Sequence, residues 1–211
     1  MTRTRIKVCG ITRAKDASAA VAAGADALGV VLTPSARQVT LEQAEVAFAG
    51  VPPFITRVGV FVDADAAFVA EAVARLGLGA VQFHGSETPE ACAAAPVPAI
   101  KAFRIGPAFS AAAVAPYEGA VSAVLFDAFV AGVAGGTGRT FPWREAAAAV
   151  PEWAPLVLAG GLASGNVGAA VAALHPFAVD VSSAVEVSPG VKDPARMLSF
   201  VAAVRAAEEE D

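Results

Sequence analysis

The sequence is poor in cysteine and histidine, with two of each among 211 residues. Cys9 and Cys92 lie far apart in different settings, which argues against a disulfide framework and predicts a reducing, cytoplasmic environment. His84 and His175 share no zinc-type spacing with these cysteines, and no nicotinamide-binding glycine fingerprint is present. We therefore expect neither a metal nor another cofactor.

Long apolar runs and basic clusters are also missing. The chain is 56% hydrophobic, but much of this is alanine, and no run reaches the roughly 18 apolar residues of a membrane span. The first residues lead into a strand containing Lys7, so no secretory signal is expected. A formal net charge of −5 without a basic run argues against a nucleic-acid partner. We expect a small-molecule ligand, no membrane partner, and a monomer or homodimer.

Strand-like and helix-like segments alternate along the chain. The predicted strands are 5–9, 25–32, 57–62, 80–83, 98–103, 121–126, 155–159 and 178–181. The predicted helices are 16–23, 40–49, 64–75, 87–95, 108–115, 144–150, 163–174 and 193–207. Eight such units in a chain of this size predict a single (β/α)₈ TIM barrel, an α/β fold, over residues 1–211. A doubly wound open sheet is the alternative, but its glycine-rich first turn is missing.

Polar and glycine residues gather directly after the predicted strands, where a barrel places its active site. They are Cys9, Gly10, Ser35, Arg37, Asp63, His84, Gly85, Asp127, Gly160, Gly161, Ser182 and Ser183. Helix capping would explain some of these positions. It does not readily explain a cysteine, an arginine, a histidine and an aspartate together.

Cys9 and Asp127 are the titratable side chains whose positions most favour chemistry. Lys7 and Cys9 share one face of a strand, and a cation beside a thiol favours the thiolate. Asp127 ends an almost wholly apolar strand, where partial desolvation suits a proton donor. The structural alternatives are a small core cysteine and a solvated or helix-capping aspartate.

The remaining candidates would hold a ligand. The glycine-rich stretch 131–143, which includes Gly136, has the length of a binding loop. Gly160, Gly161, Ser182 and Ser183 follow strands seven and eight, where barrels commonly bind phosphate, although the serines could instead cap helices. Arg37 could pair with a carboxylate, or lie on the surface, and His84 could line the pocket or be structural. His175 and Cys92 are interpreted as structural.

Taken in order, several motifs resemble the phosphoribosylanthranilate isomerase family. They are KVCGIT at 7–12, GADALG at 24–29, SAR at 35–37, RVGVF at 57–61, VQFHG at 81–85, GGTGRTF at 135–141, LAGGL at 158–162, VDVSS at 179–183 and PGVKD at 189–193. The matches span nearly the whole chain. As a departure, Ala184 replaces a glycine common in the family, which would introduce strain if that position needs a positive φ.

The resemblance implies a cofactor-free Amadori rearrangement of N-(5′-phosphoribosyl)anthranilate in tryptophan biosynthesis. Asp127 matches the family's general acid and Cys9 its general base. Arg37 matches the contact to the anthranilate carboxylate, and Gly160, Gly161, Ser182 and Ser183 match the phosphate region. The rivals are a histidine-biosynthesis isomerase acting on a two-phosphate substrate, whose relatives use aspartates as both acid and base, and a non-catalytic phospho-ligand-binding barrel.

One hypothesis goes beyond the resemblance. Strands one and eight are neighbours in a closed barrel. Lys7 and Asp180 stand two residues before Cys9 and Ser182 on these strands, so all four side chains would face inward together. We therefore expect a Lys7–Asp180 ion pair beneath the site that orients Lys7 toward the Cys9 sulfur.

Overall fold

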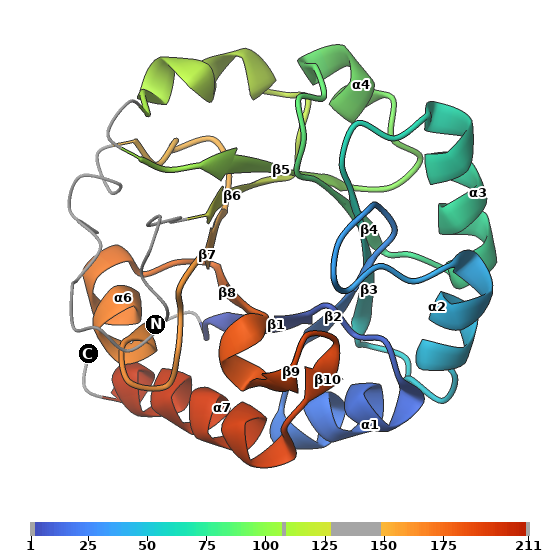
Figure 1. The fold of residues 1–211 in the computed structure, drawn as a ribbon. Coiled ribbons are helices and arrows are strands. Elements are labelled where there is room, and N and C mark those ends of the chain that lie inside the picture. Colours follow the sequence, from blue (N-terminus) through green and yellow to red (C-terminus); the bar gives the residue numbers. More distant parts are fainter. Residues whose placement is uncertain (1–2, 107–108, 128–148, 210–211) are drawn as a thin grey trace.

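A computed structural model describes residues 3–106, 109–127 and 149–209 of the protein. Its parallel strands close into a barrel in the order β1-β2-β3-β4-β5-β6-β7-β8, with helices around the outside (Figure 1). The strands are β1 Arg5–Cys9, β2 Ala27–Val31, β3 Thr56–Phe61, β4 Ala80–Phe83, β5 Ala99–Arg104, β6 Ala123–Asp127, β7 Leu156–Ala159 and β8 Ala178–Val181. The predicted TIM barrel is confirmed, and each predicted strand is present with its ends shifted by at most two residues.

Within the described residues the helices up to α6 lie between successive strands of the barrel, and α7 follows the last strand. They are α1 Ala14–Ala23, α2 Leu41–Ala47, α3 Ala66–Leu76, α4 Pro89–Ala93, α6 Val167–Leu174 and α7 Pro194–Glu209. Side-chain caps explain several of the starts: Thr40 forms a capping box with Gln43, and Asp65 and Thr88 accept from the first turns of α3 and α4. The helix expected at 144–150 lies mostly outside the described residues.

The helix predicted over 108–115 is wrong in the part of the chain that the structure describes. Two short 3₁₀ turns occupy this region instead, η1 Ala111–Ala113 and η2 Ala115–Tyr117. Ser110 caps the first turn, and Pro116 stands at the start of the second. Because proline has no N–H to donate, it prevents the two turns from merging into one α-helix.

A small hairpin after β8 was not predicted. A 3₁₀ turn, η3 Ser183–Val185, leads into β9 Glu186–Ser188 and β10 Val191–Lys192, which pair antiparallel with Lys192 opposite Glu186. The Thr12 hydroxyl donates to the Gly190 carbonyl, and the Lys192 N–H donates to Asp16. The hairpin therefore packs on the β1–α1 connection, as Figure 1 shows.

Hydrophobic side chains fill two separate regions. The larger region lies between strands and helices and includes Phe61, Phe126 and Phe200. The smaller one lies inside the barrel and consists mainly of small side chains: Ala102, Ala123, Leu125, Val157, Ala159 and Ala178, with Ile100 against them. Since alternate strand residues face the same way, these residues identify the inward positions of β5 to β8.

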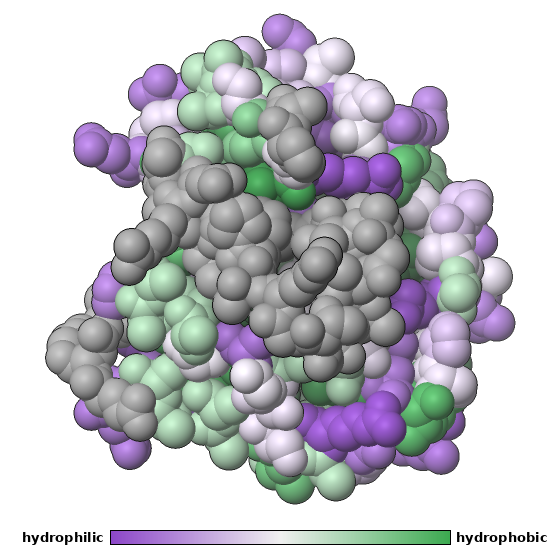
Figure 2. All heavy atoms as spheres, turned by 60° about the vertical axis from the view of Figure 1, so that its left-hand side comes forward, coloured by the Kyte–Doolittle hydropathy of each residue, from purple (hydrophilic) through white to green (hydrophobic). Residues whose placement is uncertain are grey.

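The two ends of the described chain meet at the outer layer. The N–H of Thr4 bonds to Glu208, and Arg205 donates to the Thr4 carbonyl at 2.8 Å. On the face turned forward in Figure 2, hydrophilic groups are scattered among pale, weakly hydrophobic ones, which agrees with a hydropathy dominated by alanine. Among the described residues, no helix has the length and apolar character needed to cross a membrane.

Candidate active site

Four sequence-predicted residues meet at the carboxyl-terminal rim of the barrel. Cys9 and Asp127 end β1 and β6, while His84 and Ser182 directly follow β4 and β8. Asp127 continues the inward-facing series of Ala123 and Leu125 in β6. Because all strands are parallel, these side chains share one end of the barrel.

The predicted Lys7–Asp180 pair is present one layer below Cys9. The two residues lie opposite each other in the β1–β8 register, and Lys7 Nζ donates to Asp180 Oδ2 at 2.9 Å. Their side chains are only 5% and 9% exposed. The other carboxylate oxygen, Oδ1, is buried without a hydrogen-bond partner among the described residues. Asp180 therefore depends on Lys7 for compensation of its charge.

Lys7 also lies beside the sulfur of Cys9, and the two groups interact electrostatically. Gly29 of β2 makes room for both groups. A Cβ at this position would stand 3.0 Å from the Cys9 sulfur and 3.2 Å from Lys7 Nζ, closer than side chains normally approach. The φ of Gly29 is not positive, so the need for glycine here is one of space.

The net effect on the thiol differs from the simple expectation that Lys7 would make Cys9 a thiolate. Burial raises the pKa of Cys9 and outweighs the lowering effects of Lys7 and Lys192. For Lys7 itself, burial acts to lower the pKa, but Asp180 and Cys9 together raise it. Both shifts favour the protonated thiol and the protonated amine near neutral pH.

A chain of hydrogen bonds leads to Asp127. The Gln82 amide nitrogen lies 3.1 Å from His84 Nδ1, and His84 Nε2 lies 3.2 Å from Asp127 Oδ2. In this amide orientation Gln82 donates to Nδ1, so Nε2 carries the proton directed at Asp127. His84 thus contacts the candidate acid, and Gln82, which sequence reasoning did not single out, contacts His84.

Arg37 forms the bidentate carboxylate pair that its sequence context suggested, but with Glu186 of the hairpin. Its Nε and Nη2 donate to Glu186 at distances between 2.7 and 3.1 Å. Gly10 allows this arrangement, because a Cβ there would stand 2.5 Å from Arg37 Cδ, and the φ of Gly10 is +77°. Arg37 is therefore held across the end of β1 instead of extending freely into solvent.

The predicted phosphate region lies beside these groups. Gly160 and Gly161 follow β7 in a left-handed backbone conformation, with φ of +81° and +66°. Ser182 occupies the N-cap position of η3, but its side chain makes no capping hydrogen bond. Its hydroxyl donates instead to the Cys9 carbonyl at 3.1 Å. Ala184 lies within η3 and has no positive φ, so the strain considered for this substitution does not arise.

The charges of this rim act on one another. Burial raises the pKa of Asp180, Lys7 acts against this rise, and His84 and Asp127 have smaller effects. The pKa of Arg37 is raised chiefly by its hydrogen bond to Glu186 and to a smaller extent by Cys9, while burial acts to lower it.

Gly136 and the rest of the stretch 131–143 lie outside the described residues. Among the described residues, no cluster of His, Cys, Asp and Glu suits a metal ion.

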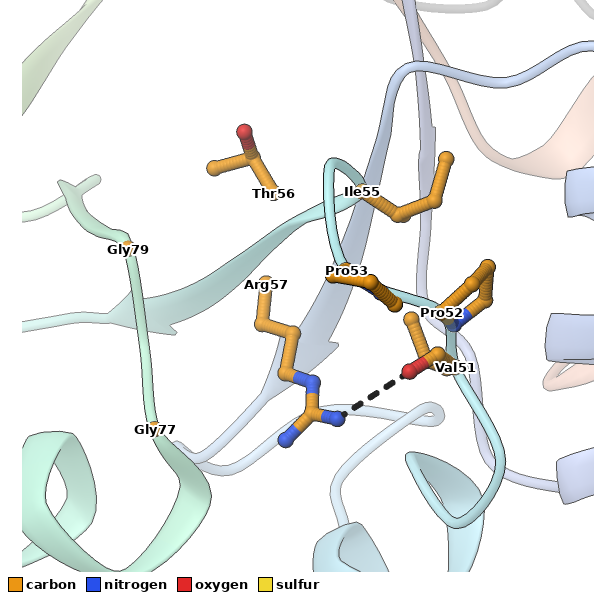
Figure 3. Close-up of a pocket in the computed structure, with 8 residues that line it drawn as sticks. All are labelled: Val51, Pro52, Pro53, Ile55, Thr56, Arg57, Gly77 and Gly79. Carbon is orange, nitrogen blue, oxygen red and sulfur yellow. Dashed lines mark hydrogen bonds between the residues drawn. The ribbon is translucent and has the colours of Figure 1, made fainter.

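A hollow in the surface lies at the opposite end of the barrel. Figure 3 shows Val51, Pro52 and Pro53 before β3 facing Gly77 and Gly79 before β4, with Arg57 directed at the Val51 carbonyl. These segments precede their strands, so the hollow is separate from the rim of Cys9 and Asp127. His175 also lies at this end, capping α6, and Cys92 is buried in α4, as predicted for both.

Comparison with known proteins agrees with this geometry. The sequence model of the family described as N-(5'phosphoribosyl)anthranilate (PRA) isomerase matches residues 6–203. N-(5'-phosphoribosyl)anthranilate isomerases of Pseudomonas syringae pv. syringae (strain B728a) and Nitrosospira multiformis are 46% and 43% identical over 207 and 205 residues, covering 97% of this chain and 98% of each relative.

Solved structures give the same result. Phosphoribosyl anthranilate isomerase from Thermotoga maritima aligns with a TM-score of 0.86 at 36% identity, over 96% of this chain and 99% of that one. An isomerase in complex with reduced 1-(o-carboxyphenylamino)-1-deoxyribulose 5-phosphate aligns with a TM-score of 0.83 at 34% identity, with the same coverage. The chain described here therefore belongs to the phosphoribosylanthranilate isomerase family.

Proposed function

We propose that this protein isomerises N-(5′-phosphoribosyl)anthranilate to 1-(2-carboxyphenylamino)-1-deoxyribulose 5-phosphate, with Asp127 as general acid and Cys9 as general base. The observation that carries the proposal is the convergence of a buried thiol, a partly exposed carboxyl group and an arginine at one barrel rim. A cysteine at the end of β1 also favours this reaction over that of the histidine-pathway isomerases, whose relatives use an aspartate as the base.

The first step opens the sugar ring. Asp127 protonates the furanose oxygen, the bond from that oxygen to C1′ breaks, and a Schiff base forms with the anthranilate nitrogen. For Asp127 to carry this proton, His84 Nε2 must act as acceptor. Gln82 Oε1 has no hydrogen-bond partner among the described residues. A rotation of the Gln82 amide turns this oxygen toward Nδ1–H and supports that form of His84.

In the second step Cys9 removes the proton at C2′. The electron pair moves toward the Schiff-base nitrogen and gives the enolamine, which tautomerises to the ketone. Proton removal needs the thiolate, which Lys7 and Lys192 favour against the effect of burial. Each proton-transfer group typically contributes about 10²–10⁴-fold in rate.

Binding is assigned to groups around this centre. Arg37 binds the anthranilate carboxylate, and Gly160, Gly161, Ser182 and Ser183 bind the phosphate, with His84 and Gly136 lining the substrate. The isomerase of Thermotoga maritima is described as dimeric. For this chain a monomer or homodimer, a cytoplasmic location and a single domain over residues 1–211 stay our predictions.

The test is a fluorescence assay. N-(5′-phosphoribosyl)anthranilate is generated in situ, EDTA is added, and loss of its anthranilate-type fluorescence is followed. We expect rapid consumption by the wild type and by Asp65→Asn, a variant of an exposed α3 cap, and severe loss in Asp127→Asn. No consumption by the wild type would refute the function, and full activity of Asp127→Asn would refute the assigned acid.

A further inference from the structure

We propose that Glu186 is a positioning residue that aims Arg37 at the substrate carboxylate, with Lys192 as its second cation. The proposal rests on the function given above, because it assigns Arg37 to that carboxylate. It adds the β9–β10 hairpin, which carries both Glu186 and Lys192, to the substrate-binding apparatus.

Glu186 is saturated by groups of the protein itself. Its Oε1 accepts from Arg37 Nε at 2.9 Å, from Lys192 Nζ at 2.7 Å and from the Gly190 N–H at 3.2 Å. Its Oε2 accepts from Arg37 Nη2 at 2.7 Å and Nε at 3.1 Å. With its side chain 4% exposed, Glu186 has no accepting position left for a ligand. Any effect on substrate must therefore act through its partners.

The pair fixes which edge of Arg37 stays available. A guanidinium has five N–H donors in a planar fork, and Glu186 takes the edge formed by Nε and Nη2. Among the described residues none accepts from Nη1. The Nη1 end is left for a substrate carboxylate, which would approach end-on. Without Glu186 the long Arg37 side chain would regain its rotamer freedom and lose this orientation.

The charges suit an anionic ligand. Two cations and one carboxylate leave one net positive charge in a cluster in which Glu186 and Lys192 are buried and Arg37 is partly exposed. Burial acts to raise the pKa of Glu186, but hydrogen bonds from Arg37 and Lys192 hold it below its usual value. Glu186 is therefore ionised near neutral pH and can hold Arg37 in place before the substrate binds.

The cluster also connects the subsites. Lys192 Nζ, fully buried, donates to the Ser182 carbonyl at 3.3 Å, and the Ser182 hydroxyl donates to the Cys9 carbonyl at 3.1 Å. A chain of contacts thus runs from the carboxylate-binding arginine through the hairpin to the phosphate region and to the backbone of the base.

A double-mutant cycle tests the proposal. We would measure KM and kcat for Glu186→Gln, Arg37→Ala and the double variant, and the Kd of reduced 1-(o-carboxyphenylamino)-1-deoxyribulose 5-phosphate for each. We expect Glu186→Gln to raise KM and Kd about tenfold with a smaller change in kcat. In the Arg37→Ala background the same substitution should add almost nothing.

Glu87→Gln is the matched control. Glu87 lies at the same rim, its side chain is 5% exposed, and Lys101 donates to it at 2.8 Å, but it makes no described contact with Arg37. Its effect on KM should be the same in both Arg37 backgrounds. If Glu186→Gln folds poorly, Glu186→Gln with Lys192→Met removes the unpaired buried ammonium and serves in its place.

The outcomes distinguish a failure of the positioning role of Glu186 from a failure of the proposed function. An effect of Glu186→Gln on KM that is equal in both Arg37 backgrounds, or no effect at all, overturns the positioning role and leaves the proposed function intact. An Arg37→Ala variant with unchanged KM and Kd overturns the assignment of Arg37, and the positioning role with it. Absence of turnover in the wild type refutes the proposed function, while the Kd values still measure whether Glu186 acts through Arg37.

Discussion

Replacing Lys7 with methionine tests the buried charge pair beneath the thiol. The substitution keeps an unbranched side chain but removes the cation that, among the described residues, bonds to Asp180. Asp180 would then be a buried carboxylate without a described partner on either oxygen. Removing one partner of a buried pair typically costs about 3–5 kcal/mol, a large share of the roughly 5–15 kcal/mol that stabilises a domain.

Removing Lys7 and removing Asp180 should shift the pKa of the Cys9 thiol in opposite directions. Lys7 lowers the pKa of Cys9 and Asp180 raises it. Lys7→Met should therefore raise the pKa of Cys9 further, whereas Asp180→Asn should lower it. Ultraviolet absorbance of the thiolate against pH, with Cys9→Ser as the reference, measures both shifts and subtracts the signal of Cys92.

Urea unfolding measures the free energy of unfolding lost in Lys7→Met, and the comparison requires equal m-values for the two proteins. The double variant Lys7→Met with Asp180→Asn removes both charges and should be more stable than Lys7→Met alone. A loss below about 1 kcal/mol for Lys7→Met would be typical of a surface pair and would contradict the buried geometry. An unchanged pKa of Cys9 in Lys7→Met would rule out lysine as its modulator.

Three further predictions concern neighbouring groups. Gly29→Ala should reduce kcat by displacing the thiol and the amine beside it. Gly106→Ala, where a Cβ would meet none of the described residues within 4 Å, should leave the rate unchanged. Gln82→Leu should lower kcat with little change in KM, because His84 loses its partner at Nδ1. A rise in KM as large as the fall in kcat would instead indicate a general packing defect. The pKa of Glu186 is lowered on folding, so its ionised form stabilises the protein above the usual value of 4.5 and this contribution disappears as the pH falls through the folded value. Acid unfolding of Glu186→Gln should thus depend less on pH than that of the wild type, and parallel curves would contradict this.

The strands were predictable because their signal is local. Runs such as Ala123–Asp127 are buried on both faces, and continuous apolar character with a terminal polar residue reveals both the strand and its rim. The Lys7–Asp180 pair was also predictable, since closing a barrel places the first and last strands side by side. The alternation of side chains along a strand and the closure of the barrel were enough for these predictions.

The partners of Arg37 and His84 were not predictable in the same way. Glu186 lies 149 residues from Arg37, in a short hairpin whose strands of three and two residues are below the length at which alternation can be recognised. Gln82 stands within a buried strand, where a single polar residue gives no indication of its partner. The state of Cys9 also needed the structure, because burial and charge act on it in opposite directions.

The most direct test of the account is the Cys9→Ala variant, assayed for turnover and for binding together. If Cys9 is the base, kcat for N-(5′-phosphoribosyl)anthranilate should fall about 10²–10⁴-fold. The Kd of reduced 1-(o-carboxyphenylamino)-1-deoxyribulose 5-phosphate should stay close to that of the wild type, because the thiol is assigned no binding role. Turnover of Cys9→Ala near the wild-type rate would contradict the central claim that this sulfur removes the proton at C2′.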